Sequence, residues 1–303
     1  MKRLYSYIIL FLCLISTSYL FSQSKINRFF KPSDTLNTSR RNTVLITEAS
    51  LASITLIGLD RLWYADYPRS KFKTINDGGE WLQMDKFGHV LSSYQLTKLG
   101  ANSFNWAGVS RKNQLIYGAS LSLGFLTAVE LMDGFSEEWG FSWTDIAANT
   151  LGAGLYTGQE LLWGEQRIVL KYSFHRTHFA QLRPDKLGSG LTEEFLKDYN
   201  GQTYWLSANI KSFLNVDAIP NWLNLAFGYG ADGMLSGYPN DPLFPNQNRI
   251  RQFYLSLDID LSRIKTNSHV LKTIFDVFNI IKIPFPTVEF NSKSRLKLHY
   301  FYF

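Results

Sequence analysis

The chain has 303 residues, of which 18% are charged and 16% aromatic, and its formal net charge is +6. This positive excess is mild and forms no basic block interleaved with aromatic residues, which argues against a nucleic-acid partner and leaves attraction to anionic lipid headgroups open. The aromatic share exceeds that of an ordinary soluble domain and is typical of a membrane interface or of a bulky core.

Residues 1–23 have the pattern of a secretory signal peptide. Lys2 and Arg3 precede a mostly apolar run over residues 4–20, and residues 21–24 supply small and polar positions for cleavage. The run is short and is interrupted by serine and threonine, so it makes a poor membrane-spanning helix, and an uncleaved anchor is the alternative. We therefore expect an exported protein.

The single cysteine, Cys13, lies inside this apolar run. A lipoprotein cysteine needs a small residue directly before it, whereas Phe11 and Leu12 precede Cys13. We expect no lipid attachment at this position. After cleavage the chain would contain no cysteine, so packing rather than disulfides must stabilise the fold.

A helical domain is predicted over residues 43–164, after a linker over residues 24–42. Apolar residues recur there at helical spacing in four segments separated by glycine, proline and asparagine. The third and fourth segments are rich in glycine, alanine and serine, which let helices approach closely, either inside a bundle or against lipid. The predicted helices are Thr43–Tyr64, Asp85–Gly100, Asn113–Met132 and a segment from Ser142 to just before Gly164.

An antiparallel β domain is predicted over residues 165–303, because the apolar period changes to two after Gly164. One amphipathic helix, over residues 270–281, interrupts the sheet. The overall fold class is therefore α+β. The predicted strands are Ile168–Phe174, Tyr204–Leu214, Trp222–Ala231, Phe253–Ser262, Thr287–Phe290 and Leu296–Phe303.

The β domain leaves two architectures open: a small outer-membrane barrel, or a sheet whose apolar face is covered by the helices. Strands of about ten residues with one apolar face and a terminal aromatic residue are typical of barrels. However, Lys297 and His299 share the phase of Phe303, where barrels are apolar. Six predicted strands are also fewer than the roughly eight of the smallest barrels. Further strands within residues 181–200 would favour the barrel.

Three of the predicted helices carry polar pairs one turn apart, which are expensive to bury in apolar segments. If these pairs converge, they form a site that could hold a divalent cation or use an imidazole as a general base. We assign His89 as the base, with Asp85 or Glu130 as its orienting partner. Asp145 would be a second carboxylate or metal ligand. The pairs are Asp85 and His89, with Lys86 close by, then Glu130 and Asp133, then Asp145 and Asn149.

Structural explanations compete with a functional site at the same residues. Residues 142–145 fit a capping box, in which the Asp145 carboxylate would accept from the Ser142 N–H. Asp85 fits a helix N-cap or first turn, and Asn149 a buried amide between two helices.

The remaining candidates also have structural readings. His89 could be a core imidazole bonded to Glu130. Asp77 and Glu80 precede the second helix and are expected to be exposed loop carboxylates, with membership of the site as the alternative. The other four histidines, in strand or loop segments, are not assigned to the site; they are His175, His178, His269 and His299.

The same residues carry a family resemblance. The motifs Asp85-Lys86-x-x-His89, Glu130-x-x-Asp133, and residues 140–145 followed by Asn149 and Gly152-Ala153 resemble the YfiM-like domain of predicted periplasmic lipoproteins. The resemblance covers residues 81–156. It implies export and a helical domain, and it carries no activity over, because the family has none established.

The chain departs from small members of that family because it lacks a lipoprotein cysteine motif and adds a β-rich second half, as in longer versions found in Bacteroidetes. A looser similarity connects it to VanZ-like membrane proteins. Those carry an Asp-Lys-x-x-His, a downstream Glu and an Asp-x-x-x-Asn on consecutive helices.

Two functions follow as expectations, and the sequence does not decide whether the protein is an enzyme. The first is an outer-membrane-associated envelope protein with a lipid-related or cell-wall-related ligand, or a hydrolytic site, on the helical domain. The second is a non-enzymatic structural or accessory subunit of an outer-membrane complex. In both cases membrane lipid or another envelope component is the expected partner. A third arrangement, in the inner membrane, would require an uncleaved first helix.

Overall fold

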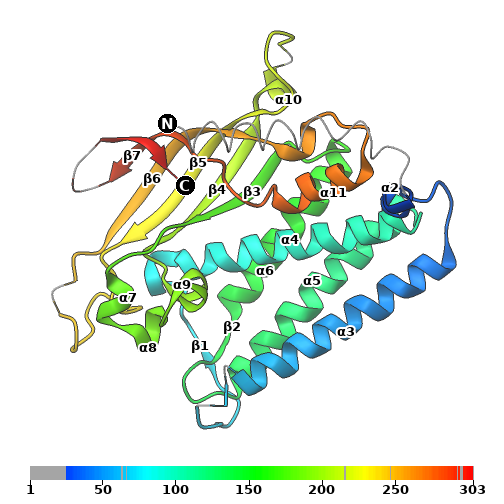
Figure 1. Cartoon of the computed structure of the whole chain (residues 1–303). Helices are drawn as coiled ribbons and strands as arrows, with labels where there is room; N and C mark the ends of the chain where they lie inside the picture. Colours follow the sequence, from blue (N-terminus) through cyan, green and yellow to red (C-terminus); the bar gives the residue numbers. More distant parts are fainter. Residues whose placement is uncertain are drawn as a thin grey trace.

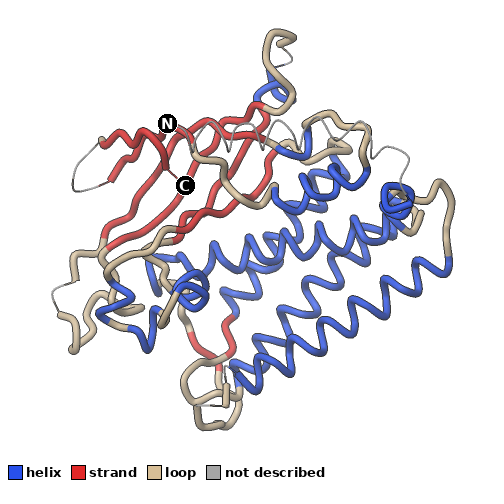
Figure 2. The backbone as a smooth tube through the Cα atoms, in the orientation of Figure 1, coloured by secondary structure: helices blue, strands red, loops and turns tan. Residues whose placement is uncertain are grey.

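The computed structural model describes residues 25–303 except positions 63, 66, 215, 246, 292, 294, 295 and 303. The predicted signal peptide, Cys13 and the terminal Phe303 therefore lie outside the described residues. The described chain combines a helical N-terminal half with an antiparallel six-stranded sheet in its C-terminal half (Figure 2). The α+β prediction is confirmed.

Four long helices overlap the four predicted ones, and a short helix precedes them (Figure 1). Residues 24–42 are not only a linker, because they contain α2 and the first turn of α3. The apolar spacing of the sequence does not indicate α2, because contacts with a distant part of the chain stabilise this helix. The Asn27 side chain accepts hydrogen bonds from Ser268 and Val270, at the start of α11 (His269–Phe278). The helices are α2 (Lys25–Phe30), α3 (Thr38–Leu62), α4 (Met84–Trp106), α5 (Arg111–Gly134) and α6 (Trp143–Leu162).

Glycines let α4 pack closely between α5 and α6 (Figure 1). A Cβ atom on Gly118 of α5 would lie 2.4 Å from the Thr97 carbonyl oxygen of α4. A Cβ atom on Gly152 of α6 would lie 2.2 Å from the Val90 carbonyl oxygen. Both distances are far inside van der Waals contact, so helix packing requires glycine at these two positions.

The C-terminal sheet is antiparallel, and its strands are neighbours in chain order. α11 (His269–Phe278) lies between β6 and β7, where the amphipathic helix was predicted. The strands are β3 (Ile168–Phe174), β4 (Gln202–Asn209), β5 (Leu223–Asp232), β6 (Ile250–Ile259), β7 (Phe285–Asn291) and β8 (Lys297–Tyr302).

Two predicted strands are too long because polar side chains redirect the backbone while the apolar alternation continues. The strand predicted over residues 204–214 ends at Asn209, whose side-chain oxygen accepts from the Ser212 N–H at 2.9 Å and begins α10 (Ile210–Leu214). The strand predicted over residues 253–262 ends at Ile259, because Asp260 caps a short 3₁₀ turn by accepting from the Ser262 N–H.

Residues 181–200 hold no strand among their described positions. They fold into short helices near one end of the sheet (Figure 1), and the sheet keeps its six strands. The outer edge of β3 is paired at Tyr172 with residues 280–282. The Tyr172 N–H donates a hydrogen bond to the Ile280 carbonyl, and the Tyr172 carbonyl accepts one from the Lys282 N–H. The short helices are α7 (Phe179–Leu182), α8 (Pro184–Leu187) and α9 (Leu191–Lys197).

The sheet curls with its polar face inside. Lys171 on β3 and Asp258 on β6 form an ion pair of 2.8 Å, and both side chains are fully buried, although two strands separate β3 from β6. The apolar face points outward, and much of it is exposed: Phe227 is 52% exposed, Phe253 51% and Leu298 70%. The helices cover only part of this face, where Phe87 of α4 stacks on Tyr229 with ring centroids 4.6 Å apart.

A short parallel pair, β1 (Thr74–Ile75) and β2 (Phe141–Ser142), joins the loop before α4 to the start of α6. Two described helical segments are long and apolar enough to cross a membrane by length and composition. They are Thr38–Arg61, whose apolar window is only 6% buried, and Arg111–Gly134, whose window is 28% buried. The first is thus a largely uncovered apolar surface.

Candidate functional site

The first turns of α4, the end of α5 and the start of α6 meet at one polar site. We call it the helical polar cluster and define it as Asp77, Asp85, Lys86, His89, Glu130, Asp145 and Asn149. Three of these residues come from α4, one from α5, two from α6 and one from the loop before α4. The structure thus brings most of the predicted site residues together.

The entry into α4 is held in an unusual backbone conformation. Trp81, Leu82 and Gln83 have φ values of +46°, +53° and +66°, which L-residues other than glycine rarely adopt. The sheet holds this turn, because Tyr229 of β5 donates its hydroxyl to the Leu82 carbonyl, and the Trp81 N–H donates to the Gly237 carbonyl at 2.9 Å. Such strain gathers at functional sites, and here it fixes the direction in which α4 begins.

Lys86 lies at the centre of three carboxylates. Its Nζ atom is 2.6 Å from Asp145, 2.7 Å from Asp77 and 2.9 Å from Asp85. Burial alone would lower the pKa of this ammonium, but Asp85 and Asp145 outweigh burial and raise it. Lys86 therefore stays charged and neutralises part of the cluster.

His89 is oriented by Asn149, not by Asp85 or Glu130 as expected. Its Nδ1 atom lies 3.1 Å from Asn149 Oδ1, which can only accept, so Nδ1 carries the proton. Glu130 Oε1 is 3.8 Å from Nδ1, too far for a hydrogen bond. Nε2 then faces Asp145 Oδ1 at 3.6 Å and Asp85 Oδ1 at 3.8 Å.

The pKa of His89 is raised, although burial opposes this. Asp85 contributes most to the rise, followed by Asp145 and Glu130. The pKa of Asp145 is itself raised to about 6, by burial and by its neighbour Asp85, and despite Lys86. His89 and Asp145 therefore hold their protons more tightly than the same groups would in water.

The capping box at the start of α6 is only half formed. The Ser142 hydroxyl accepts from the Asp145 N–H at 3.1 Å, as a helix N-cap does. The reciprocal bond, however, comes from Glu130, whose Oε2 accepts from the Ser142 N–H at 3.3 Å. The Asp145 carboxylate is therefore not used for capping and turns toward Lys86 and His89 instead.

Asp77 is a site residue that the sequence placed in an exposed loop. It is buried and accepts from Ser142 at 2.6 Å and from Thr144 at 2.7 Å, in addition to its ion pair with Lys86. Burial raises its pKa, but these hydrogen bonds outweigh burial and lower the pKa to about 2. The pairing of β1 with β2 brings Asp77 to α6, and nothing local in the sequence indicates that pairing. Glu80 lies outside the cluster, near Tyr238.

Asp133 does not join the cluster directly. Its carboxylate accepts from the Tyr64 hydroxyl at 2.7 Å and so connects α5 to the end of α3. Tyr199, which the sequence did not single out, does join: its hydroxyl donates to Asp85 Oδ1 at 2.8 Å. It comes from the loop after α9, more than a hundred residues away along the chain, so no spacing rule could have found it.

Three atoms of the cluster fit the ligand set of a divalent cation. One ring nitrogen of His89 and one oxygen each of Asp85 and Asp145 lie within 4.8 Å of one another. Burial and Asp145 raise the pKa of Glu130 to about 8, so Glu130 is mostly protonated at neutral pH. With Asp77, Asp85 and Asp145 ionised and Lys86 charged, the cluster carries two net negative charges when His89 is neutral and one when His89 is protonated. One imidazole with carboxylates suits Zn²⁺ or Mn²⁺.

A buried donor also lacks a partner at this site. Among the described residues, none accepts a hydrogen bond from Asn149 Nδ2, although Asn149 is only 1% exposed. A buried amide donor without an acceptor costs free energy. Asp85 and His89, by contrast, remain about a fifth exposed. The cluster is therefore incomplete and can be reached from one side.

Comparison with known families gives one match. Residues 74–157 match a family described as predicted periplasmic lipoprotein (DUF2279). This segment contains the whole helical polar cluster, and the match supports an exported protein of the cell envelope. No curated protein and no solved structure matches the chain.

Proposed function

We propose that the helical polar cluster binds a lipid-related or cell-wall-related ligand and hydrolyses it, in an exported protein that rests on the outer membrane. The observation that carries this proposal is the gap between His89 Nε2, Asp85 and Asp145. His89 Nε2 lies 3.6 Å from Asp145 and 3.8 Å from Asp85, too far for direct hydrogen bonds, and the three atoms lie within 4.8 Å of one another, close enough to share a water or a cation.

The chemistry assigned to the gap is general-base hydrolysis. His89 Nε2 accepts a proton from a water held by Asp85 and Asp145, and the water oxygen attacks the scissile centre of the ligand. His89 then returns the proton to the leaving group. Asn149 keeps the imidazole in the required tautomer. If His89 Nε2 instead held a divalent cation together with Asp85 and Asp145, the cation would activate the water by lowering its pKa, and His89 would be a ligand and not the base.

Membrane contact is supported by the outward apolar faces. Ile46 and Ile54 on α3 are 68% and 65% exposed, and the outer face of the sheet is apolar over β4 to β8. Monomeric soluble proteins rarely expose contiguous apolar patches of this kind. The expected occupant is the lipid of the outer membrane, because a polar interior with an apolar exterior is the arrangement that hydrocarbon surroundings favour.

An alternative function also has an observation in its favour. Lys86 is fully paired by three carboxylates, and such networks can specify one helix arrangement without any chemistry. In that case the protein would be a structural or accessory subunit of an outer-membrane complex.

The test compares His89→Ala and His89→Gln with the wild-type chain. Both are measured for thermal unfolding and for the ability to restore envelope integrity, as detergent resistance, in cells lacking the protein. Glutamine can still donate to Asn149 but cannot act as a base. Loss of resistance in both variants with near-wild-type melting supports hydrolysis. Full function in His89→Gln, or loss only in proportion to stability, supports the structural alternative.

A further inference from the structure

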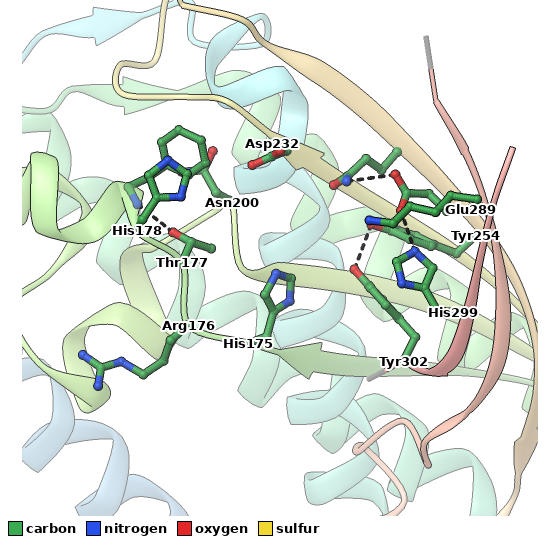
Figure 3. A pocket seen from close by; sticks show the side chains of 13 residues that line it. His175, Arg176, Thr177, His178, Asn200, Asp232, Tyr254, Glu289, His299 and Tyr302 are labelled. Carbon is green, nitrogen blue, oxygen red and sulfur yellow. Dashed lines mark hydrogen bonds and ion pairs between the residues drawn. The ribbon is translucent and has the colours of Figure 1, made fainter. Parts of the chain in front are cut away.

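A second polar cavity lies at one end of the curled sheet, away from the helical polar cluster (Figure 3). Its volume is about 320 Å³, at the lower end of the range of about 300–1,000 Å³ for ligand sites. β6, β7 and β8 form one wall, and the segment after β3 forms the other.

One wall of the cavity is aromatic. Tyr254 and Tyr302 stack with ring centroids 4.5 Å apart, and His299 packs edge-on against Tyr302 at 4.9 Å. His175 extends this wall from the end of β3, with its ring 6.1 Å from that of Tyr302. Aromatic faces carry negative potential and attract the weakly positive C–H groups of a ligand.

The wall is held rigidly by its own hydrogen bonds. The Glu289 carboxylate pairs with His299 Nε2 at 2.7 Å and accepts from Gln252 at 3.1 Å. The Tyr302 hydroxyl donates to the Tyr254 hydroxyl at 2.8 Å. Burial raises the pKa of both tyrosines, so their hydroxyls stay protonated. A preorganised polar wall loses little entropy when a ligand binds.

On the opposite side, the Asp232 carboxylate faces the cavity (Figure 3). Among the described residues, none pairs with this carboxylate or donates to it. The lining holds two carboxylates, Asp232 and Glu289, and the cations Arg176 and Lys297. Arg176 is paired with Glu194 outside the lining at 2.6 Å, so its charge does not offset that of Asp232. Burial lowers the pKa of His175, which therefore stays neutral. The cavity thus presents an open carboxylate acceptor, which disfavours an anion and suits a ligand that offers hydroxyl donors.

We propose that this cavity binds a neutral sugar unit of an envelope glycan. Ring C–H groups would pack on Tyr302 and His175, and hydroxyl groups would donate to Asp232. This site is separate from the helical polar cluster and does not depend on the function proposed there. It would hold a glycan against the protein while the apolar faces rest on the membrane.

The test is saturation-transfer NMR on the full chain purified in detergent, with glucose and N-acetylglucosamine as probes at concentrations on the order of 10 mM. We expect at least one of them to bind, and Asp232→Ala to weaken binding roughly tenfold, since one hydrogen bond to a charged acceptor is lost. Asp217→Ala is the matched control, because Asp217 is exposed and lies near α10, at the opposite end of β4. Thermal melting confirms that each variant is folded.

Two outcomes overturn the proposal: neither sugar binds, or binding is the same in Asp232→Ala as in wild type. His89→Ala separates the two sites. Sugar binding that persists in His89→Ala supports an independent cavity, whereas loss of binding in that variant would assign the sugar to the helical polar cluster and overturn the cavity proposal.

Discussion

Two regions of the molecule bury charged side chains, and they do so in opposite ways. Inside the curled sheet, Asp258 lies 2.8 Å from Lys171 and 3.9 Å from Lys282, and all three are fully buried. Backbone carbonyls accept additional hydrogen bonds from both ammonium groups, one from Lys171 at 2.7 Å and two from Lys282 at 2.6 and 2.9 Å. This network is closed to solvent and well supplied with acceptors.

The helical polar cluster is open by comparison. It carries excess negative charge, His89 remains a fifth exposed, and the Asn149 amide has a donor without a partner among the described residues. A satisfied buried network fixes a fold, whereas perturbed groups left incomplete at an accessible position indicate a site that receives something. The comparison therefore favours a structural role for the sheet interior and supports the site proposed at the helical polar cluster.

The largest effect is expected from breaking the closed network. Asp258→Leu leaves Lys171 and Lys282 buried without a counter-charge, so we expect the free energy of unfolding to fall by about 3–5 kcal/mol in urea denaturation. Asp217→Leu, at an exposed position, is the control and should leave the unfolding curve unchanged. A loss below about 1 kcal/mol for Asp258→Leu would mean that water reaches the network, and the contrast between the two regions would fail.

The next effect tests the close helix packing that brings the cluster together. Gly152→Ala places a Cβ atom against the Val90 carbonyl, so we expect a loss of about 1–3 kcal/mol in the free energy of unfolding. Gly154 is the matched control, because it lies in the same helix and a Cβ there meets nothing within 4 Å. Gly154→Ala should be neutral or stabilise by up to about 1 kcal/mol. Equal effects of the two substitutions would contradict the role of Gly152.

Periodicity in the sequence located the long helices and most strands, because each buries one face along its whole length. It did not show which face of the sheet lies inside. Alternation in the sequence distinguishes the two faces of a strand, but tertiary structure decides which face is buried. The polar interior around Asp258 could therefore be seen only in the folded structure. Asn209 and Asp260 ended two strands early, because capping by a side chain overrides an alternation that continues beyond it.

The polar pairs on the helices indicated convergence because charges in apolar helices must meet partners. What spacing could not provide was the partner of each group. Glu130, not Asp145, completes the cap at Ser142, and Asn149, not a carboxylate, orients His89. Asp77 reaches the cluster only through the pairing of β1 with β2. The catalytic roles of these residues stay predictions.

The open cluster makes a prediction about cations. We expect the full chain to bind one Zn²⁺, with an affinity that rises by about tenfold per pH unit as long as the pH stays below the raised pKa of His89, in calorimetric titration. The sign follows from the raised pKa of His89: below it the imidazole holds a proton that the cation must displace. His89→Ala should abolish binding and His269→Ala should not. Binding that is independent of pH or of His89 would leave the cluster as a structural network.

The smallest expected effect on stability comes from a substitution that distinguishes helix capping at Ser142 from the ion pair between Lys86 and Asp145. Ser142→Ala removes the N-cap of α6 and the Ser142 hydrogen bond to Asp77, which Lys86 still pairs, and we expect a loss of about 1–2 kcal/mol in the free energy of unfolding. The pKa of His89, followed by the NMR shifts of its ring protons, should stay above its ordinary value, because Lys86 rather than the cap holds the Asp145 carboxylate. Lys86→Met is the comparison and should move the Asp145 carboxylate and change that pKa. If Ser142→Ala changes the pKa of His89 as much as Lys86→Met does, then the helix cap also positions the Asp145 carboxylate. In that case, the cluster would contain both structural and functional residues.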